Sequence, residues 1–364
     1  MQRTPDVLVI GGGVIGCAIA DTLAATGRSV LLVDRGAIGG EASSAAAGVL
    51  AVAGGDAEGA ELALRRESLA RHAALAAELL ADTGLDVELD RSGTLELFDG
   101  GDDARAQERL DHRRSQGFRV DWLDARELRA CEPAAQPSAC GALLFHDDAW
   151  LVNERLVEAL AASARRRGAE LVAGAAVRAA ERAGRRIARV EVGGDWITPG
   201  TVVLAAGAWA AHVPDVAPGL DVRPARGQML ALRPSRPLCR RVLAHGDSYL
   251  VPRQSGEVLV GATVEDAGWE KAVTPDGLRT LIAHVERIAP AGLAAPVSRV
   301  WAGLRPYAPA GGPIIGRAPA TENLVIACGH HRNGILLAPI TAAIVQAVLD
   351  GTAAPVDVAP FAPR

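Results

Sequence analysis

The feature that most constrains the fold is a glycine-rich turn near the start of the chain, between two short apolar segments. Residues 7–10 read Val-Leu-Val-Ile, and a short, branched, apolar run of this kind predicts a buried parallel strand. Gly11, Gly13 and Gly16 follow with the spacing Gly-x-Gly-x-x-Gly. Glycines at this spacing allow a tight turn, a close approach of the backbone to a pyrophosphate group, and close packing of the next helix on the sheet.

The residues after this turn complete the pattern. Residues 17–25 predict a helix whose N-terminus, with its unpaired N–H groups and partial positive charge, faces the phosphates. Gly27 ends this helix, residues 29–33 predict a second strand, and Asp34 follows near the ~20-residue distance at which an acid binds a ribose hydroxyl. We therefore predict a dinucleotide-binding fold, with a glycine turn that serves packing alone as the alternative. The acid disfavours NADP but does not separate NAD from FAD.

Bulk properties exclude several classes of protein. A length of 364 residues suits two domains, and a net charge of −5 gives no basic surface for nucleic acid. The apolar stretch 334–349 contains Pro339 and Gln346 and is shorter than the ~20 residues needed to span a bilayer. A strand beginning at Val7 leaves no room for a signal peptide. We expect a soluble, cytoplasmic protein with no membrane partner.

The cysteines and histidines do not indicate a metal site. Five cysteines, an odd number without a Cys-x-x-Cys pair, predict reduced and mostly buried thiols. Cys131 and Cys140 could pair, but nothing in the sequence requires it. His330 and His331 have no third ligand at a recognisable spacing, so we expect no metal.

Residues 39–50 consist almost entirely of small side chains. Such a segment makes a poor core but suits a backbone that lies flat against a large planar ligand. Ser43 and Ser44 offer hydroxyl and amide donors for phosphate oxygens. A flexible alanine-rich loop is the alternative.

Caps, periodicity and turn signals indicate the later elements. Asn153 and Thr274-Pro275 are expected to begin helices, and the arginine run 165–167 is expected to offset a helix dipole. Short strands with turn signals from 170 to 206 predict an antiparallel meander that leads into a second glycine turn at 206–209. The other predicted elements are helices over 61–80, 103–116 and 275–287, strands at 92–98, 202–205, 228–232 and 323–328, and a hairpin over 248–261.

The last strand is followed by residues 329–334, Gly-His-His-Arg-Asn-Gly, and then by an apolar helix. Pro339 is expected early in this helix, where a missing N–H matters least. An N-terminus facing a flavin's pyrimidine edge would stabilise the negative charge of the reduced ring. A helix that merely closes the sheet is the alternative.

Four motifs together resemble the glycine oxidases, FAD-dependent enzymes of thiamine thiazole synthesis in the D-amino-acid oxidase superfamily. The similarity covers nearly the whole chain, and the last two motifs are the most restrictive. The motifs are Val-Ile-Gly-Gly-Gly at 9–13, Gly-Glu-Ala-Ser-Ser-Ala-Ala-Ala-Gly at 40–48, Trp-Ala-Gly-Leu-Arg-Pro at 301–306, and Gly-His-His-Arg-Asn-Gly-Ile-Leu-Leu-Ala-Pro at 329–339.

The resemblance implies an α/β fold with two domains. One is a Rossmann-type FAD-binding domain, a parallel sheet plus an antiparallel meander; the other is a substrate domain built on an antiparallel sheet flanked by helices. We expect the FAD-binding domain to be discontinuous. We place it at 1–85, 141–220 and 301–364, and the substrate domain at 86–140 and 221–300.

The resemblance also implies the oxidative deamination of glycine, with sarcosine and small D-amino acids as further candidate substrates. Hydride transfer to flavin N5 would give an imine, then glyoxylate and ammonia, while oxygen would become hydrogen peroxide. We expect a small amino acid and oxygen as partners, together with a homo-oligomeric state. Carried over by position, or expected from the glycine turns, the FAD contacts are Gly11, Gly13, Val14, Ile15, Gly16, Asp34, Arg35, Ala42, Ser43, Ala47, Gly48, Val49, Val177, Gly207, His330, His331, Arg332, Asn333, Gly334, Ile335 and Leu336.

Arg305, Arg332 and Tyr249 are the catalytic residues that the resemblance implies. An amino acid must present its Cα–H to flavin N5, so its carboxylate needs a rigid anchor, and the planar fork of arginine supplies two parallel charge-assisted hydrogen bonds. A surface salt bridge is the alternative for Arg305, and core packing is the alternative for Tyr249. Positioning, rather than acid–base work by side chains, is expected to supply most of the acceleration.

Two departures from the family pattern matter. Val264 stands where glycine oxidases have methionine, so the pocket wall is reshaped and the substrate is less certain than the cofactor. Relatives with covalent flavin use a cysteine where this chain has Tyr-Ala-Pro at 307–309, so we expect non-covalent FAD. Four alternative hypotheses remain. They are a sarcosine oxidase-like enzyme, a D-amino-acid dehydrogenase that passes electrons to an acceptor other than oxygen, a flavin-binding subunit of a larger complex, and an NAD dehydrogenase.

Overall fold

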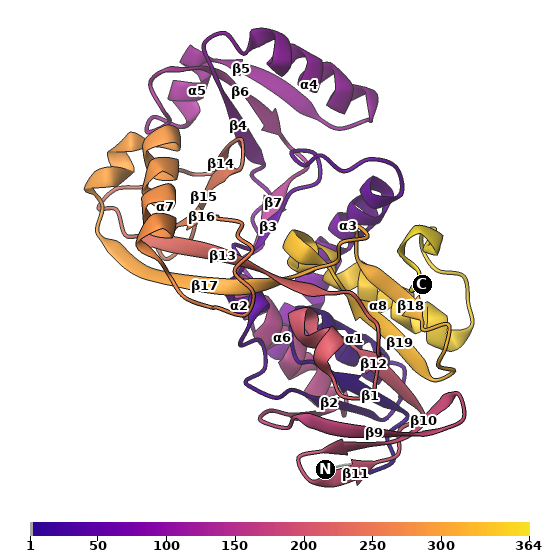
Figure 1. The fold of residues 1–364 in the computed structure, drawn as a ribbon. Helices are drawn as coiled ribbons and strands as arrows, with labels where there is room; N and C mark the ends of the chain where they lie inside the picture. The colour runs from indigo at the N-terminus through magenta and orange to yellow at the C-terminus, as the bar shows by residue number, and fades with distance from the viewer. Residues whose placement is uncertain (1–2) are drawn as a thin grey trace.

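Two β-sheets organise the chain in the computed structural model, which describes residues 3–364 (Figure 1). The first sheet has six strands in the order β18-β19-β12-β1-β2-β8, and only β18 runs antiparallel to its neighbour. Its central strands are fully buried, as expected for a parallel sheet covered on both faces. The strands are β1 (Val7–Ile10), β2 (Val30–Val33), β8 (Glu170–Val172), β12 (Thr201–Leu204), β18 (Ile314–Arg317) and β19 (Leu324–Cys328).

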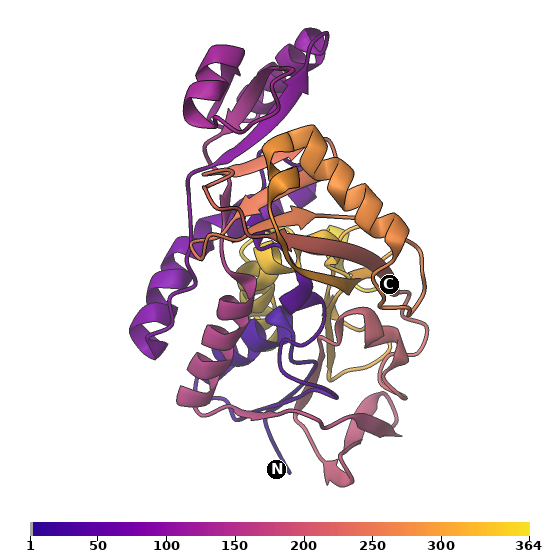
Figure 2. The same ribbon diagram turned by 90° about the vertical axis from the view of Figure 1, so that its left-hand side faces the viewer.

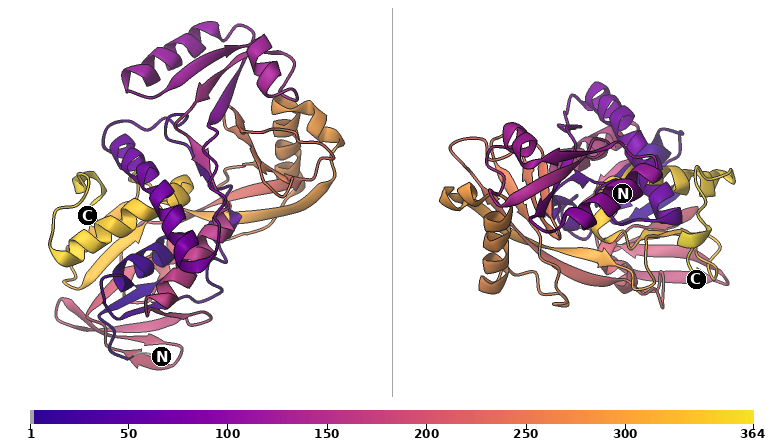
Figure 3. Two further views of the ribbon diagram at one scale, coloured as in Figure 1. Left: turned by 180° about the vertical axis from the view of Figure 1, so that it is seen from behind. Right: turned by 90° about the horizontal axis from the view of Figure 1, so that it is seen from above.

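Different layers cover the two faces of this sheet. Four helices form one hydrophobic core with it and pack against one another, and the left view of Figure 3 shows the yellow α8 beside α3. A three-stranded antiparallel meander forms a second core on the opposite face. The helices are α1 (Val14–Ala24), α3 (Gly59–Thr83), α6 (Asn153–Arg166) and α8 (Gly334–Asp350), and the meander strands are β9 (Val177–Ala183), β10 (Arg186–Val192) and β11 (Asp195–Ile197).

The second sheet has eight strands in the order β17-β13-β16-β15-β14-β4-β6-β5, antiparallel throughout except for the pair β14–β4. Helix α7 lies along one face and shares a core with it (Figure 2). The strands are β4 (Thr94–Asp99), β5 (Val120–Asp124), β6 (Ala139–Phe145), β13 (Arg223–Leu232), β14 (Val242–His245), β15 (Ser248–Pro252), β16 (Val258–Gly261) and β17 (Val297–Tyr307), and the helices are α4 (Asp103–Ser115), α5 (Ala125–Cys131) and α7 (Pro275–Ile288).

Several shorter elements complete the fold. They are α2 (Ala42–Ala45), the two-stranded pair β3 (Val49–Leu50) and β7 (Ala149–Trp150), and the 3-10 helices η1 (Gly207–His212), η2 (Pro290–Ala294), η3 (His331–Asn333) and η4 (Ala359–Phe361). The fold class is the predicted one, a Rossmann-type parallel sheet with a meander and a second, antiparallel sheet flanked by helices. The domain boundaries stay a prediction.

Helix α8 differs from expectation in two ways. The continuous helical segment His331–Asp350 is 20 residues long and apolar enough to cross a membrane, so the argument from length was wrong. In this structure 56% of its most apolar window is buried inside the protein, where α8 packs against α1 and α3, so core packing explains its composition. Pro339 lies inside the helix, beyond its first turn, and not at its start.

Two buried polar groups of α3 hold the first turn of α8. Ser68 donates its hydroxyl to the carbonyl oxygen of Leu336, and His72 Nε2 lies 2.9 Å from the same oxygen. Burial lowers the pKa of His72 to about 4, against an ordinary value of 6.5. His72 is therefore neutral in the folded protein near neutral pH.

Because of His72, we expect the free energy of unfolding to decrease as the pH is lowered below neutral. The unfolded chain takes up a proton below pH 6.5, whereas the folded chain resists protonation until about pH 4, so the free energy of unfolding falls over this window. From pH 7 to pH 5 the loss from this one group is about 2 kcal/mol. Urea unfolding at both pH values should show a smaller pH-dependent loss for His72→Gln, and an equal loss in both proteins would contradict this role.

Candidate functional site

A cavity of about 1500 Å³ lies where the two sheets meet. One side is made by the residues that follow the carboxyl ends of β1, β2, β12 and β19, which is where parallel α/β sheets bind ligands. The other side is made by residues of β13, β15 and β17. The volume exceeds the ~300–1,000 Å³ of ordinary small-molecule pockets and suits a ligand as long as a dinucleotide.

The glycine turn has the geometry expected from its spacing. Gly11 has φ +113°, and a Cβ placed on it would lie 2.4 Å from the carbonyl oxygen of Ala205. A Cβ on Gly16 would lie 1.8 Å from the carbonyl oxygen of Gly11, so Gly16 lets α1 pack close to β1. Side chains are excluded from this turn, which leaves its backbone open to the cavity.

Asp34 and Arg35 lie at the carboxyl end of β2 and line the cavity. The backbone N–H groups of Gly12 and Gly36 each donate to a carboxylate oxygen of Asp34, both at 2.7 Å, and so fix its orientation. The guanidinium of Arg35 stacks over the ring of Trp209 with 3.9 Å between its central carbon and the ring centroid. The ribose contact of Asp34 stays a prediction.

Two buried side chains, which were not predicted from the sequence as site residues, hold the segment of small residues in place. Asn153 was expected to cap α6, but Val152 occupies the N-cap position, and the Asn153 amide donates to the carbonyl oxygens of Ser43 and Ser44 at 2.7 and 3.2 Å. The hydroxyl of Ser43 in turn accepts the N–H of Val14 at 2.9 Å, at the start of α1.

Arg253 is the second of these side chains. It follows β15, is 9% exposed, and donates to the carbonyl oxygen of Ala47 at 2.9 Å and to Asn153 Oδ1 at 3.3 Å. Its Nη1 has no partner among residues 3–364, and burial lowers its pKa to about 10. The buried guanidinium thus binds one backbone oxygen of the 43–47 segment and the side chain of Asn153, which itself holds that segment, so the shape of the segment is strongly specified.

Arg305 lies on β17 and Tyr249 on β15, separated by β13 and β16 in the antiparallel sheet, and the two side chains interact. The charge of Arg305 opposes the rise in the Tyr249 pKa that burial causes. Arg305 donates to the carbonyl oxygen of Thr263 at 3.0 Å, and burial lowers its pKa. No carboxylate lies within 4.0 Å of its guanidinium in the described part of the chain.

Two glycines make room for these side chains. A Cβ on Gly227 would lie 2.3 Å from the guanidinium nitrogens of Arg305, and a Cβ on Gly261 would lie 2.4 Å from the hydroxyl of Tyr249. Gly261 is directly opposite Tyr249 in the ladder of β15 and β16. Any larger residue at either position would displace the catalytic candidates.

The residues between β19 and α8 bring three charged or titratable groups to the cavity. His330 is buried, its Nε2 lies 3.0 Å from Thr341 Oγ1, and burial lowers its pKa to about 3. His331 has φ +47° and packs edge-on against Tyr307, and its pKa falls to about 4 because of burial and the charges of Arg305 and Arg332. Arg332 is half exposed.

Most of the predicted site residues therefore meet in one cavity. Gly16 and Leu336 do not line it, since Gly16 serves packing and Leu336 is buried in the core. Val264 lines the cavity and is half exposed. The predicted residues that line it are Gly11, Gly13, Val14, Ile15, Asp34, Arg35, Ala42, Ser43, Ala47, Gly48, Val49, Val177, Gly207, Tyr249, Arg305, His330, His331, Arg332, Asn333, Gly334 and Ile335.

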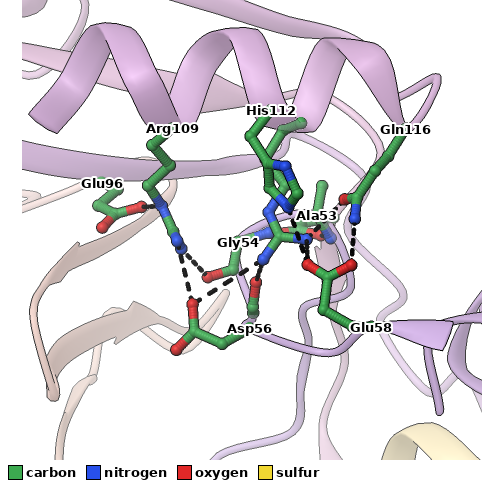
Figure 4. Close-up of polar contacts among 11 residues, drawn as sticks. Ala53, Gly54, Asp56, Glu58, Glu96, Arg109, His112 and Gln116 are labelled. Carbon is green, nitrogen blue, oxygen red and sulfur yellow. Dashed lines mark hydrogen bonds and ion pairs between the residues drawn. The ribbon is translucent and has the colours of Figure 1, made fainter.

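The cavity extends to a loop, residues 51–58, that was not singled out from the sequence. Figure 4 shows Arg109 of α4 between Glu96 and Asp56; its guanidinium also donates to the carbonyl oxygen of Gly54. From the other side the buried carboxylate of Asp148 accepts the N–H groups of residues 52, 53 and 54. These contacts fix the loop as one wall of the cavity.

Comparison with known proteins identifies relatives over the whole length. The DAO family model, described as FAD dependent oxidoreductase, matches residues 6–347. The chain is 32% identical to the hydrogen cyanide synthase subunit HcnC of Pseudomonas aeruginosa, over 99% of this chain and 96% of that protein. It is 33% identical to the glycine oxidase of Bacillus licheniformis, over 96% and 94%. The crystal structure of glycine oxidase from Geobacillus kaustophilus superposes with a TM-score of 0.94 and 30% identity, covering 100% and 99%.

Asn153 and Arg253 together form a clamp, because their hydrogen bonds hold the segment from Ser43 to Ala47. This clamp leads to a prediction about FAD affinity. Arg253→Ala leaves the carbonyl oxygen of Ala47 without its donor, and a lost buried partner of this kind costs roughly 1–3 kcal/mol. We expect the dissociation constant for FAD, measured by titrating apoprotein and following flavin fluorescence, to rise by about tenfold or more. Arg189→Ala, which removes an exposed arginine from the meander, is the control. Unchanged FAD affinity in Arg253→Ala would refute the clamp.

Proposed function

Because the chain belongs to the DAO family of FAD-dependent oxidoreductases, we propose that it oxidises glycine and closely related small amines. The full-length similarity to glycine oxidases supports this substrate class. The proposal includes oxygen as the acceptor and a role in thiamine thiazole synthesis. It also retains the discontinuous domain division and the site residues given above.

The residues of the cavity fit FAD. The glycine turn and the start of α1 offer a side-chain-free surface for a pyrophosphate, and Asp34 is oriented by two backbone donors beside it. Small side chains from Ala42 to Val49 leave a flat wall for a ring system. When bound, FAD supplies the acceptor for the hydride that leaves the substrate Cα.

The single observation that carries the proposal is the state of Arg305. Its guanidinium is partly buried, lines the cavity, and has no carboxylate partner among residues 3–364. A cation that loses water without gaining a counter-ion is unfavourable, so such a group is expected to serve an anion that arrives from outside. The carboxylate of an amino acid matches its planar fork of donors.

The neighbouring residues support the same chemistry. Burial raises the pKa of Tyr249, so its hydroxyl stays protonated and can donate to the substrate carboxylate beside Arg305. His331 is neutral near pH 7 and adds no charge to the pocket. The substrate amine must be neutral when the Cα–H bond breaks, and with its carboxylate anchored the orientation of that bond is set by the protein.

We propose that FAD is held without a covalent bond. Cys328 lines the cavity, but it is 1% exposed and burial raises its thiol pKa to about 12, so it offers no reactive thiolate. The other described cysteines do not line the cavity.

A second candidate function rests on the relative HcnC. That protein is a subunit of a hydrogen cyanide synthase and is as similar to this chain as the glycine oxidases are. The alternative is a flavin subunit that oxidises a small amine and passes electrons to an acceptor other than oxygen.

One experiment separates the two functions. Anaerobic mixing of the holoprotein with glycine, sarcosine or D-proline should bleach the flavin absorbance under either reading. Admission of air should then restore the absorbance within the turnover time and produce hydrogen peroxide if the protein is an oxidase. Slow recovery in air would favour the alternative, and no bleaching by any of these amines would overturn the proposal.

Replacement of the anchor tests the role of Arg305. We expect Arg305→Ala to raise the KM for glycine on the order of a hundredfold, because a charge-assisted pair of hydrogen bonds is lost, while FAD stays bound. Arg299→Ala removes a half-exposed arginine from the same strand and should keep the parent KM. Near-normal kinetics in Arg305→Ala would remove this residue from the site.

A further inference from the structure

An exposed carboxylate, that of Asp247, lines the cavity beside Arg332, one of the two arginines predicted to bind substrate. Asp247 and Gly246 form the two-residue turn between β14 and β15, and both line the cavity. Asp247 Oδ1 lies 3.5 Å from Arg332 Nη1, with 87% of the Asp247 side chain and 51% of the Arg332 side chain exposed. The pair joins the turn of the antiparallel sheet to the segment after β19 of the parallel sheet.

The charges in this part of the cavity interact. Burial and the charge of Arg332 lower the pKa of Arg305, and burial and the charges of both arginines lower the pKa of His331, so the two guanidiniums act on the same small region. Among the described residues, Arg305 interacts with the carbonyl oxygens of Arg226 and Thr263 and with the Tyr249 hydroxyl, and it has no carboxylate partner, whereas Arg332 has Asp247. His331 and Tyr249 are neutral, and Glu265, whose charge also acts on Arg305, is paired with Arg226. Arg305, Arg332 and Asp247 then contribute two positive charges and one negative charge to this part of the cavity.

We propose that Asp247 determines substrate specificity by occupying Arg332, which leaves Arg305 as the one free anchor for an anion. The site then has a net charge that matches a single carboxylate, as in glycine or sarcosine. A substrate with a second anionic group meets a carboxylate where it would need a cation, and it is disfavoured. This inference rests on the proposed function and adds the charge class of the substrate.

The predicted preference concerns amines that differ by one charge. Sarcosine carries an N-methyl group where iminodiacetate carries an N-carboxymethyl group, so the two share the glycine portion that Arg305 would hold. In the parent protein Asp247 repels the second carboxylate of iminodiacetate. With Asp247→Asn, Arg332 becomes free to bind that carboxylate.

The test compares the parent holoprotein with Asp247→Asn at low and high salt. The first readout is the ratio of kcat/KM for iminodiacetate to kcat/KM for sarcosine. The second readout does not depend on turnover. It is the ratio of the dissociation constants for two unreactive acids, the dianion malonate and the monoanion glycolate, each measured from the shift in flavin absorbance on binding. In Asp247→Asn we expect both ratios to change about fivefold in favour of the ligand with two carboxylates. The change should be smaller at high salt, because the Asp247–Arg332 pair is exposed.

A matched control removes the same charge elsewhere. Asp195 also pairs with an arginine at 3.5 Å but does not line the cavity, so Asp195→Asn should leave both ratios at parent values. Unchanged ratios in Asp247→Asn, or an equal change in Asp195→Asn, would overturn the inference. If the parent protein oxidises neither glycine nor sarcosine, the proposed function fails instead, and the binding ratios still test Asp247.

Discussion

The candidate site depends on the guanidinium of Arg305, which is largely removed from water. Arg305 is held by the carbonyl oxygens of Thr263 and Arg226, in space that Gly227 leaves free, and it receives no carboxylate from the described chain. Its charge is therefore available to a ligand in surroundings where electrostatic attraction is stronger than in water.

The two sheets contribute different groups to the cavity that contains Arg305. The parallel sheet gathers the ends of four strands, and with them the turn and helix starts that suit a phosphate-containing cofactor. The antiparallel sheet supplies Arg305 and Tyr249 from neighbouring parts of one surface. A hydrogen-bonded ladder on each side holds these two sets of residues in fixed positions relative to one another.

The sequence allowed the parallel sheet and most of the cavity to be predicted, because their signals are local. Glycine spacing, short apolar runs and the acid after β2 each describe a few neighbouring residues. The clamp could not be predicted in this way, since Asn153 reaches Ser43 across 110 residues and Arg253 reaches Ala47 across 206. Gly227 and Gly261 became interpretable only once the strand register placed them against Arg305 and Tyr249. Leu336 was assigned to the cavity by its motif, but the helical turn directs it into the core.

The order of strands in the parallel sheet has a consequence for biosynthesis. Strand β1 begins at residue 7, yet β19, which completes the cofactor-binding edge, ends at residue 328 and is followed by the histidine-rich segment and α8. The ribosome must therefore synthesise the chain through β19 and the segment that follows it before the pocket can be complete. A chain that ends before β19 lacks one of the four strand ends that line the cavity.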